Sequence, residues 1–142
     1  MSNTLKVGDK ALLNKAFTEE EVFQFANIST DKNPLHLDKN FGGASVFGQR
    51  IVHGLLVASR FSGLIGMMLP GVGSIYLGQS LTFKAPVAID EQITASVEII
   101  NIREDKPIVT LRTVCINSEG TVVIEGEAVV KIDVPTNNHN SD

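Results

Sequence analysis

The 142-residue sequence contains one cysteine, Cys115, and three histidines. A single cysteine excludes an intramolecular disulfide and any metal site built from several thiolates. Cys115 lies in the strand-like run IVTLRTVCIN, where a buried, inert thiol is far more common than a nucleophile. His139 stands in the polar tail PTNNHNSD, which leaves two histidines in the body of the chain. The sequence therefore predicts no metal site.

Clusters of Lys and Arg are also absent, and the formal net charge is −4. This balance argues against a surface that binds nucleic acid or an anionic membrane. The N-terminal residues MSNTLKVGDK lack the apolar core of a signal peptide, so the cytoplasm is the expected compartment. The apolar run 51–69 is about long enough to span a membrane, but His53 and Arg60 inside it disfavour insertion. It is expected to be a buried helix.

The remaining pattern fits one domain over residues 1–134, followed by a flexible polar tail over 135–142. Thr18 and Glu21 form a capping-box pattern, which predicts a helix of about ten residues. Pro34 disfavours helical geometry at the preceding residue, so the stretch STDKNPLHLD (29–38) should leave that helix as a loop. A second helix is expected to begin near His53, and it is apolar on nearly every side. Such a helix is usually surrounded by other elements.

After the breaker cluster LPGVGS the apolar period changes to two, which predicts four strands over 74–87, 91–104, 107–120 and 121–134. The links between these four segments are short, and short links favour antiparallel pairing of neighbouring strands. A long apolar helix followed by an antiparallel meander indicates an α+β architecture, with the sheet wrapped on the helix. One sheet covers one side of the helix, so a homodimer is expected to close the core.

Asp31 and His36 stand five residues apart with Asn33 and Pro34 between them. Asp, Asn and Pro are typical of plain turns, so one interpretation is structural. The other is that an acid and an imidazole are directed at one point. These residues alone leave both interpretations open.

The segment RIVHGLL (50–56) offers a complementary group. A glycine at the start of a buried helix leaves its N–H free at the positive end of the helix dipole, which suits a developing oxyanion. The structural alternative is that Gly54 allows close packing, while His53 caps the helix or packs in the core. The motifs of serine hydrolases, nucleotide-binding loops and zinc proteases do not occur.

Three stretches taken together, STDKNPLHLD, FGQRIVHGLLVASRFSGLIG and LPGVGSIYLGQSLTFKAPV, resemble the MaoC-like (R)-specific enoyl-CoA hydratases over residues 8–132. The resemblance implies the hot-dog fold, a long central helix wrapped by an antiparallel sheet, in a homodimer. It implies that Asp31 and His36 are a catalytic dyad that activates a water. It also implies that the Gly54 N–H receives the thioester carbonyl oxygen.

The same resemblance implies lesser roles for other positions. Asn33 would orient the loop, and Ser62 would support the dyad or line the acyl pocket. Ile65 and Val130 would form walls of that pocket. Two departures stand out: Thr30 occupies a position that is usually glycine in the family, and Arg60 interrupts a helix face that is commonly apolar. For Arg60, a place at the surface, a pairing with an acid and a place near the CoA phosphates all remain open.

The implied reaction is the reversible syn hydration of a trans-2-enoyl-CoA to the (R)-3-hydroxyacyl-CoA, an acyl-CoA thioester chemistry that requires neither a metal nor a redox cofactor. Three alternatives remain open. One is a dehydratase that acts on acyl-carrier-protein thioesters, another is a hot-dog acyl-CoA thioesterase, and the third is a non-catalytic acyl-CoA-binding module. Polyhydroxyalkanoate precursor supply, fatty acid metabolism and a more specialised route are all compatible pathways.

Overall fold

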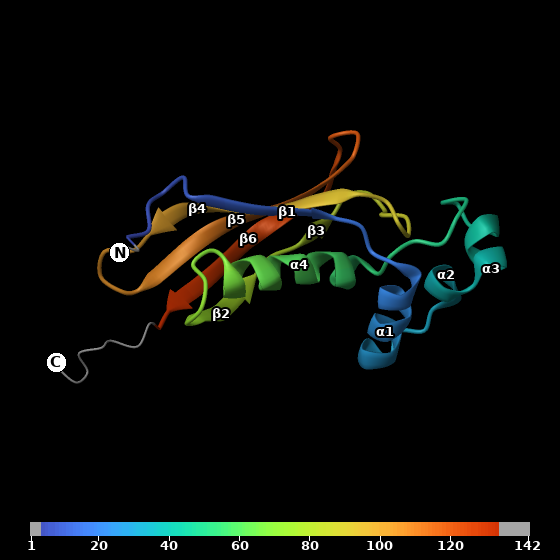
Figure 1. The fold of residues 1–142 in the computed structure, drawn as a ribbon, viewed down its shortest axis with the longest axis horizontal. Coiled ribbons are helices and arrows are strands. Elements are labelled where there is room, and N and C mark those ends of the chain that lie inside the picture. Colours follow the sequence, from blue (N-terminus) through green and yellow to red (C-terminus); the bar gives the residue numbers. More distant parts are fainter. Residues whose placement is uncertain (1–3, 134–142) are drawn as a thin grey trace.

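One antiparallel sheet and one long helix that lies along it dominate the computed structural model, which describes residues 4–133 (Figure 1). The helix is α4 (Gly54–Met67). The strands are β1 (Lys10–Lys15), β2 (Ser74–Gln79), β3 (Thr82–Phe83), β4 (Ile93–Ile102), β5 (Ile108–Asn117) and β6 (Val122–Ile132). The sheet order is β1-β4-β5-β6-β2, and β3 also pairs with β6. This is the predicted hot-dog arrangement. The predicted tail lies outside the described residues.

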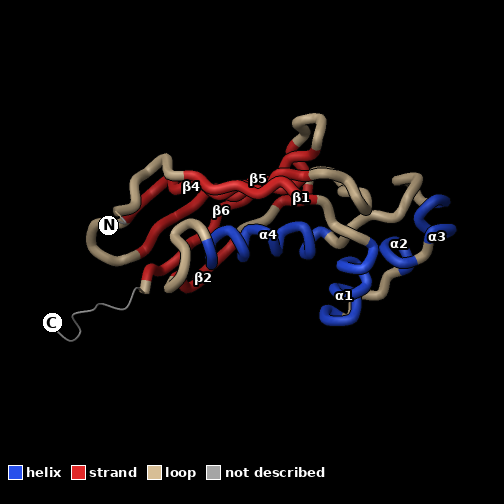
Figure 2. Tube along the Cα trace, in the orientation of Figure 1, coloured by secondary structure: helices blue, strands red, loops and turns tan. Residues whose placement is uncertain are grey.

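Three short helices gather near the N-terminal end of α4 (Figure 2). They are α1 (Glu19–Ser29), α2 (Pro34–Leu37) and α3 (Lys39–Ala44). The capping box of α1 is present as predicted: Thr18 Oγ1 accepts from the Glu21 N–H at 3.1 Å, and Glu21 Oε1 accepts from the Thr18 N–H at 2.9 Å. This local pattern fixes where α1 begins.

The prediction that residues 29–38 form a loop is only partly right. Residues 30–33 are irregular, but Pro34 begins the one-turn helix α2, and the Asn33 side chain caps it by accepting from the Leu35 N–H at 3.0 Å. Proline is well tolerated at the first helical position, where its missing N–H has no partner to lose. His36 therefore projects from a short helix.

The predicted meander is wrong at its first strand. Residues 74–87 are divided into β2 and β3, and both pair with β6, because β4 already has β1 and β5 on its two edges. At the division the chain comes very close to Gly126, where an added Cβ would lie 1.8 Å from the Ser80 carbonyl oxygen. Only glycine fits this close approach.

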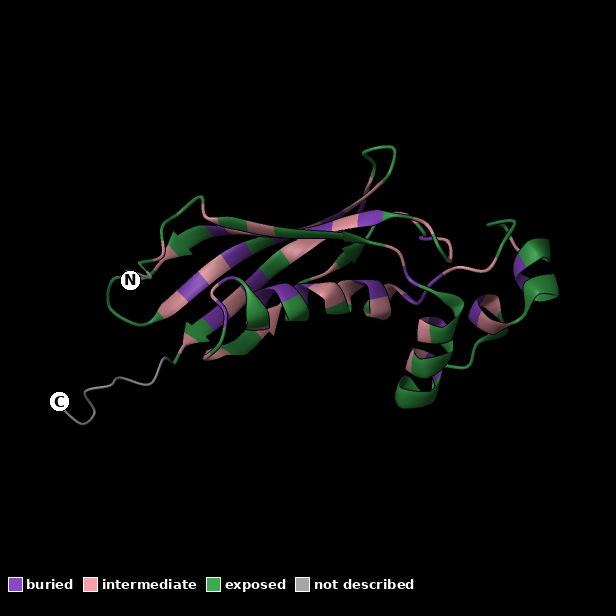
Figure 3. Cartoon of the chain, in the orientation of Figure 1, coloured by how far each residue is buried: buried purple, intermediate pink, exposed green. Residues whose placement is uncertain are grey.

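The core lies between α4 and the sheet. Val57, Phe61 and Leu64 of α4 are at most 2 % exposed, and they belong to one core cluster with buried strand residues such as Leu111. Figure 3 shows buried positions on both α4 and the strands. The outer side of α4 remains open, with Met67 73 % exposed. The expectation that α4 is surrounded is therefore not met within one chain, because the sheet covers only one of its sides.

None of the helices within residues 4–133 combines the length and the apolar character needed to cross a membrane. The apolar run 51–69 instead supplies the inner helix α4, as the sequence predicts.

Candidate active site

A cavity of about 630 Å³ opens beside the first turn of α4. Its walls come from α1, from the loop and short helix that follow, from the segment leading into α4, and from residues 83–87, which are the end of β3 and the chain after it. The lining is largely apolar, with three phenylalanines, Phe25, Phe47 and Phe83. Its polar members include the carboxylate of Asp31 and the imidazoles of His36 and His53.

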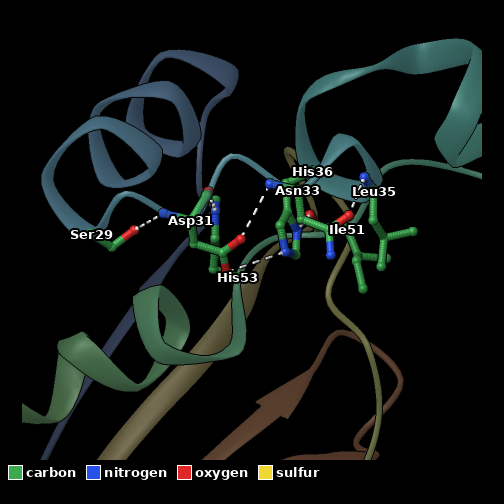
Figure 4. Close-up of polar contacts among 7 residues, drawn as sticks. All are labelled: Ser29, Asp31, Asn33, Leu35, His36, Ile51 and His53. Carbon is green, nitrogen blue, oxygen red and sulfur yellow. Dashed lines mark hydrogen bonds and ion pairs between the residues drawn. The ribbon is translucent and has the colours of Figure 1, made fainter.

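Asp31 is held by short local hydrogen bonds. Its N–H donates to Ser29 Oγ at 3.1 Å, and its Oδ1 accepts from the Asn33 N–H at 3.2 Å (Figure 4). One carboxylate oxygen is thus tied to the loop backbone, while Oδ2 is directed toward His36. The side chain is half exposed, so it stays accessible from the cavity.

Thr30 turns the chain out of α1 with φ 67° and ψ 7°, in the left-handed region. A β-branched residue adopts this conformation at a cost of roughly 1–2 kcal/mol, whereas glycine adopts it freely. This explains physically why a glycine suits the position before the acid. Thr30 keeps the turn, and Asp31 still reaches the cavity.

His36 is 8 % exposed and is oriented by the backbone. Its Nδ1 lies 2.7 Å from the Ile51 carbonyl oxygen, and because a carbonyl only accepts, Nδ1 carries the proton. In the neutral ring Nε2 then holds a lone pair, and it faces Asp31 Oδ2 at 3.9 Å. This gap is too long for a direct hydrogen bond but suits one bridging water. The predicted pair therefore converges on one point.

His53 also belongs to this cluster, although its sequence pattern indicates only a cap or a packed histidine. It makes no side-chain cap bond to α4. Its Nε2 donates to the Asp31 carbonyl oxygen at 2.9 Å, and its ring stacks on His36 with centroids 3.8 Å apart. Its Nδ1 is buried without a hydrogen-bond partner within the described residues, a situation that costs about 1–3 kcal/mol.

Burial lowers the pKa of His53, and the nearby His36 lowers it further. The hydrogen bond to the Asp31 backbone and the Asp31 charge act in the opposite direction but are smaller than burial. His53 is therefore neutral in the folded protein near neutral pH, with its proton on Nε2. Nothing in the sequence reveals this beyond the position of His53 next to Gly54.

Gly54 is the first residue of α4, and no acceptor among residues 4–133 is hydrogen-bonded to its N–H. The positive end of the helix dipole lies behind this N–H, and the residue lines the cavity. A Cβ here would lie 2.7 Å from Cδ1 and Cε1 of Phe83. The glycine thus leaves room for an aromatic ring directly beside a free donor.

The other predicted site residues lie outside the cavity lining. Asn33 caps α2, Ser62 is exposed on α4, and Ile65 and Val130 are buried in the core. The pocket roles of Ser62, Ile65 and Val130 stay predictions.

Arg60 also lies away from the cavity. Its guanidinium lies 3.8 Å from the Phe17 ring centroid and donates to the Ala16 carbonyl at 3.2 Å, which joins α4 to the chain before α1. Burial lowers its pKa, and the charge of Glu21 partly opposes this effect.

Asp31, His36 and His53 offer possible metal ligand atoms within 4.8 Å of one another. The two imidazoles, however, are stacked with an interplanar angle of 24°, so their in-plane lone pairs run side by side instead of converging on one ion. Each ring also donates one N–H to a backbone carbonyl. The donor set does not fit a metal ion, and it suits a water held between Asp31 and His36.

The structure is a hot-dog domain. One apolar cavity in it holds an acid–imidazole pair and a free N–H at a helix start. The family model of the MaoC-like domain matches residues 4–120. The chain therefore belongs to the MaoC-like family.

Individual relatives agree with this assignment. An (R)-specific enoyl-CoA hydratase of Aeromonas caviae is 53 % identical over 131 residues, which cover 92 % of this chain and 98 % of the relative. The solved structure of the (R)-hydratase from A. caviae involved in PHA biosynthesis superposes with a TM-score of 0.90 at 53 % identity, covering 92 % of this chain and 99 % of that one. A mitochondrial 3-hydroxyacyl-[acyl-carrier-protein] dehydratase of Arabidopsis thaliana is 41 % identical over 127 residues, 87 % of this chain and 75 % of the relative.

Proposed function

We propose that this protein is an (R)-specific enoyl-CoA hydratase, which reversibly adds water in syn fashion to a trans-2-enoyl-CoA to give the (R)-3-hydroxyacyl-CoA. The observation that carries the proposal is the 3.9 Å gap between Asp31 Oδ2 and His36 Nε2, in the same cavity as the free Gly54 N–H. The family membership and the 53 % identical hydratase relative support it.

The reaction begins with a water between the two side chains. His36 Nε2 has the lone pair that accepts a proton from this water, while Asp31 orients the water and stabilises the imidazolium. As the water oxygen bonds to C3, the C2=C3 electrons move onto the thioester oxygen, where the Gly54 N–H stabilises the enolate. When the enolate collapses, C2 takes a proton from the same pair. Delivery from one face gives syn addition.

The test is turnover of crotonyl-CoA, monitored by loss of the conjugated thioester absorbance and by chiral analysis of the product. We expect (R)-3-hydroxybutyryl-CoA and no release of free thiol from butyryl-CoA. Thiol release from butyryl-CoA would instead identify a thioesterase. Saturable binding of crotonyl-CoA without turnover would identify a binding module. Either result would contradict the proposal.

Acyl-carrier-protein thioesters are the principal alternative substrates, since the relative from A. thaliana is named for them. In that alternative the same pair would act in reverse, as a dehydratase. Matched crotonyl thioesters of CoA and of acyl-carrier protein decide between the carriers. We expect kcat/KM to be higher for the CoA ester, and a preference for the carrier protein would overturn that part of the proposal.

We further infer that the protein is a homodimer. The outer side of α4 and the free edge strand β2 both expose apolar side chains, including Met67 at 73 % and Leu77 at 52 %. A second copy that covers these surfaces would surround α4, as an apolar helix requires.

Sedimentation equilibrium tests this inference. We expect twice the 15.3 kDa mass of one chain, and we expect Met67→Asp to shift the population toward the monomer because a charge would be buried. The exposed Ile28→Asp on α1 is the matched control. A monomeric wild type at micromolar concentration would contradict a stable dimer.

A further inference from the structure

The proposed reaction uses Asp31, His36 and Gly54 and leaves the buried imidazole of His53, in the same cavity, without a task. His53 is 2 % exposed, and its Nδ1 is the only fully buried side-chain nitrogen or oxygen within residues 4–133 that has no hydrogen-bond partner. Burying an unpaired acceptor destabilises a protein. A residue that carries this cost at the wall of a reactive cavity calls for a compensating role.

His53 contacts both members of the proposed catalytic pair. Its Nε2–H donates to the backbone carbonyl of Asp31 at 2.9 Å, in the irregular segment that connects α1 to α2. Its ring stacks on the ring of His36 with centroids 3.8 Å apart and an interplanar angle of 24° (Figure 4). The Phe25 ring meets the His53 ring in a T-shaped contact, with centroids 4.9 Å apart and an interplanar angle of 66°. One rigid side chain thus spans from one catalytic group to the other.

The place of His53 in the chain explains why its side chain can hold both catalytic groups in position. It immediately precedes Gly54, so its backbone belongs to the N-cap of α4, the longest helix of the domain. Asp31 lies on an exposed irregular segment, and apart from the bond from His53 its hydrogen bonds are to residues close in sequence. A side chain anchored at the helix start therefore links this segment to the core and to the free N–H at the same time.

We propose that His53 is a positioning residue for hydration, which fixes the Asp31 backbone through its Nε2–H and the plane of His36 through ring stacking. Through these two contacts His53 maintains the spacing between Asp31 Oδ2 and His36 Nε2 that admits one water. The lowered pKa of His53 agrees with this role, because a neutral ring does not repel the imidazolium that His36 forms during turnover. This inference rests on the proposed hydratase function.

Two variants separate the contacts. His53→Phe keeps a ring to stack on His36 but lacks the donor for the Asp31 carbonyl, whereas His53→Gln keeps an N–H at similar reach and lacks the ring. We expect each to lower kcat by roughly 10- to 100-fold, with KM for crotonyl-CoA changed by no more than about threefold, since a misplaced group slows chemistry more than it weakens binding. Val109→Ala, a cavity-forming change at a buried residue of β5 outside the cavity lining, is the control for lost stability.

A double variant distinguishes positioning from general damage. If His53 acts through the pair, His53→Phe added to Asp31→Asn causes no further loss of kcat beyond that of Asp31→Asn alone. Additive losses would overturn the proposal. So would either single variant that retains kcat within about threefold of wild type, or losses that Val109→Ala reproduces at matched thermal stability.

Imidazole spectra test the geometry without turnover, so the two proposals can fail separately. The chain has three histidines, which makes long-range ¹H–¹⁵N correlations simple to assign with single-histidine variants. We expect the Nδ1–H form at His36 and a neutral Nε2–H form at His53, with the His36 signals displaced in both His53 variants. Unchanged His36 signals would overturn the positioning role, whereas a wild type with these signals but no hydration would overturn the proposed function instead.

Discussion

Asp31→Asn and His36→Asn should each lower kcat for hydration of crotonyl-CoA by about 10²–10⁴-fold, the range typical of a well-placed proton-transfer group. Asp31→Asn keeps an oxygen that can accept from the Asn33 N–H but removes the charge that faces His36 Nε2. His36→Asn keeps a donor for the Ile51 carbonyl oxygen and removes the base at the Nε2 position. Both changes therefore target the chemistry while local hydrogen bonds are preserved.

Steady-state kinetics at several pH values measures this result, with circular dichroism to check folding. Asp105→Asn is a suitable control, because that carboxylate pairs with Arg103 at an exposed turn outside the cavity lining. KM should change little, since neither side chain carries the bulk of the apolar contact with the substrate. Retention of more than about a tenth of wild-type kcat by both variants would show that this pair is not the acid and base.

Gly54→Pro should lower kcat by about 10²–10³-fold relative to Gly54→Ala, because proline removes the N–H that stabilises the enolate oxygen. Proline is tolerated at the first position of a helix. The preceding residue, His53, has φ −56° and ψ 132°, which is the extended geometry that proline requires before it. The backbone therefore accepts the change with little strain.

Gly54→Ala is the matched control because both variants place a Cβ against Phe83, 2.7 Å from two of its ring carbons. Phe83 is 51 % exposed, so its ring can move aside in both. A loss of kcat that both variants share measures this steric effect. The difference in kcat between the two variants measures the contribution of the Gly54 N–H. Equal kcat values for Gly54→Pro and Gly54→Ala would remove the Gly54 N–H from the mechanism.

Local physics explains which structural predictions succeed. The capping box at Thr18 and Glu21, the start of α4 at Gly54 and the period of two in the later strands depend on residues close together in sequence. Each of these features is confirmed within one or a few residues. The pairing of β2 with β6 depends instead on which sheet edge remains free, and so the predicted meander fails at that strand.

The same division holds for the site. Asp31 and His36 are separated by one tight turn, so their approach follows from local geometry. The place of Gly54 at the start of an apolar helix suggests its N–H as a donor, and the family resemblance implies the thioester oxygen as the acceptor. The resemblance also implies site roles for Ser62, Ile65 and Val130. It matches sequence positions to the family, however, and does not show what their side chains contact. In one chain these residues lie on the outer side of α4 or in the core.

The sequence by itself determined the elements, the acid–imidazole turn and the helix that begins with a glycine, because capping, turn chemistry and periodicity act within a few residues. Only the tertiary structure decided that His53 joins the two halves of the site. Its bond to Asp31 spans 22 residues, and its stack on His36 forms only when α4 packs on the sheet and brings its first turn against α1 and α2. Contacts of this kind depend on how the whole core closes, which no short stretch of sequence specifies.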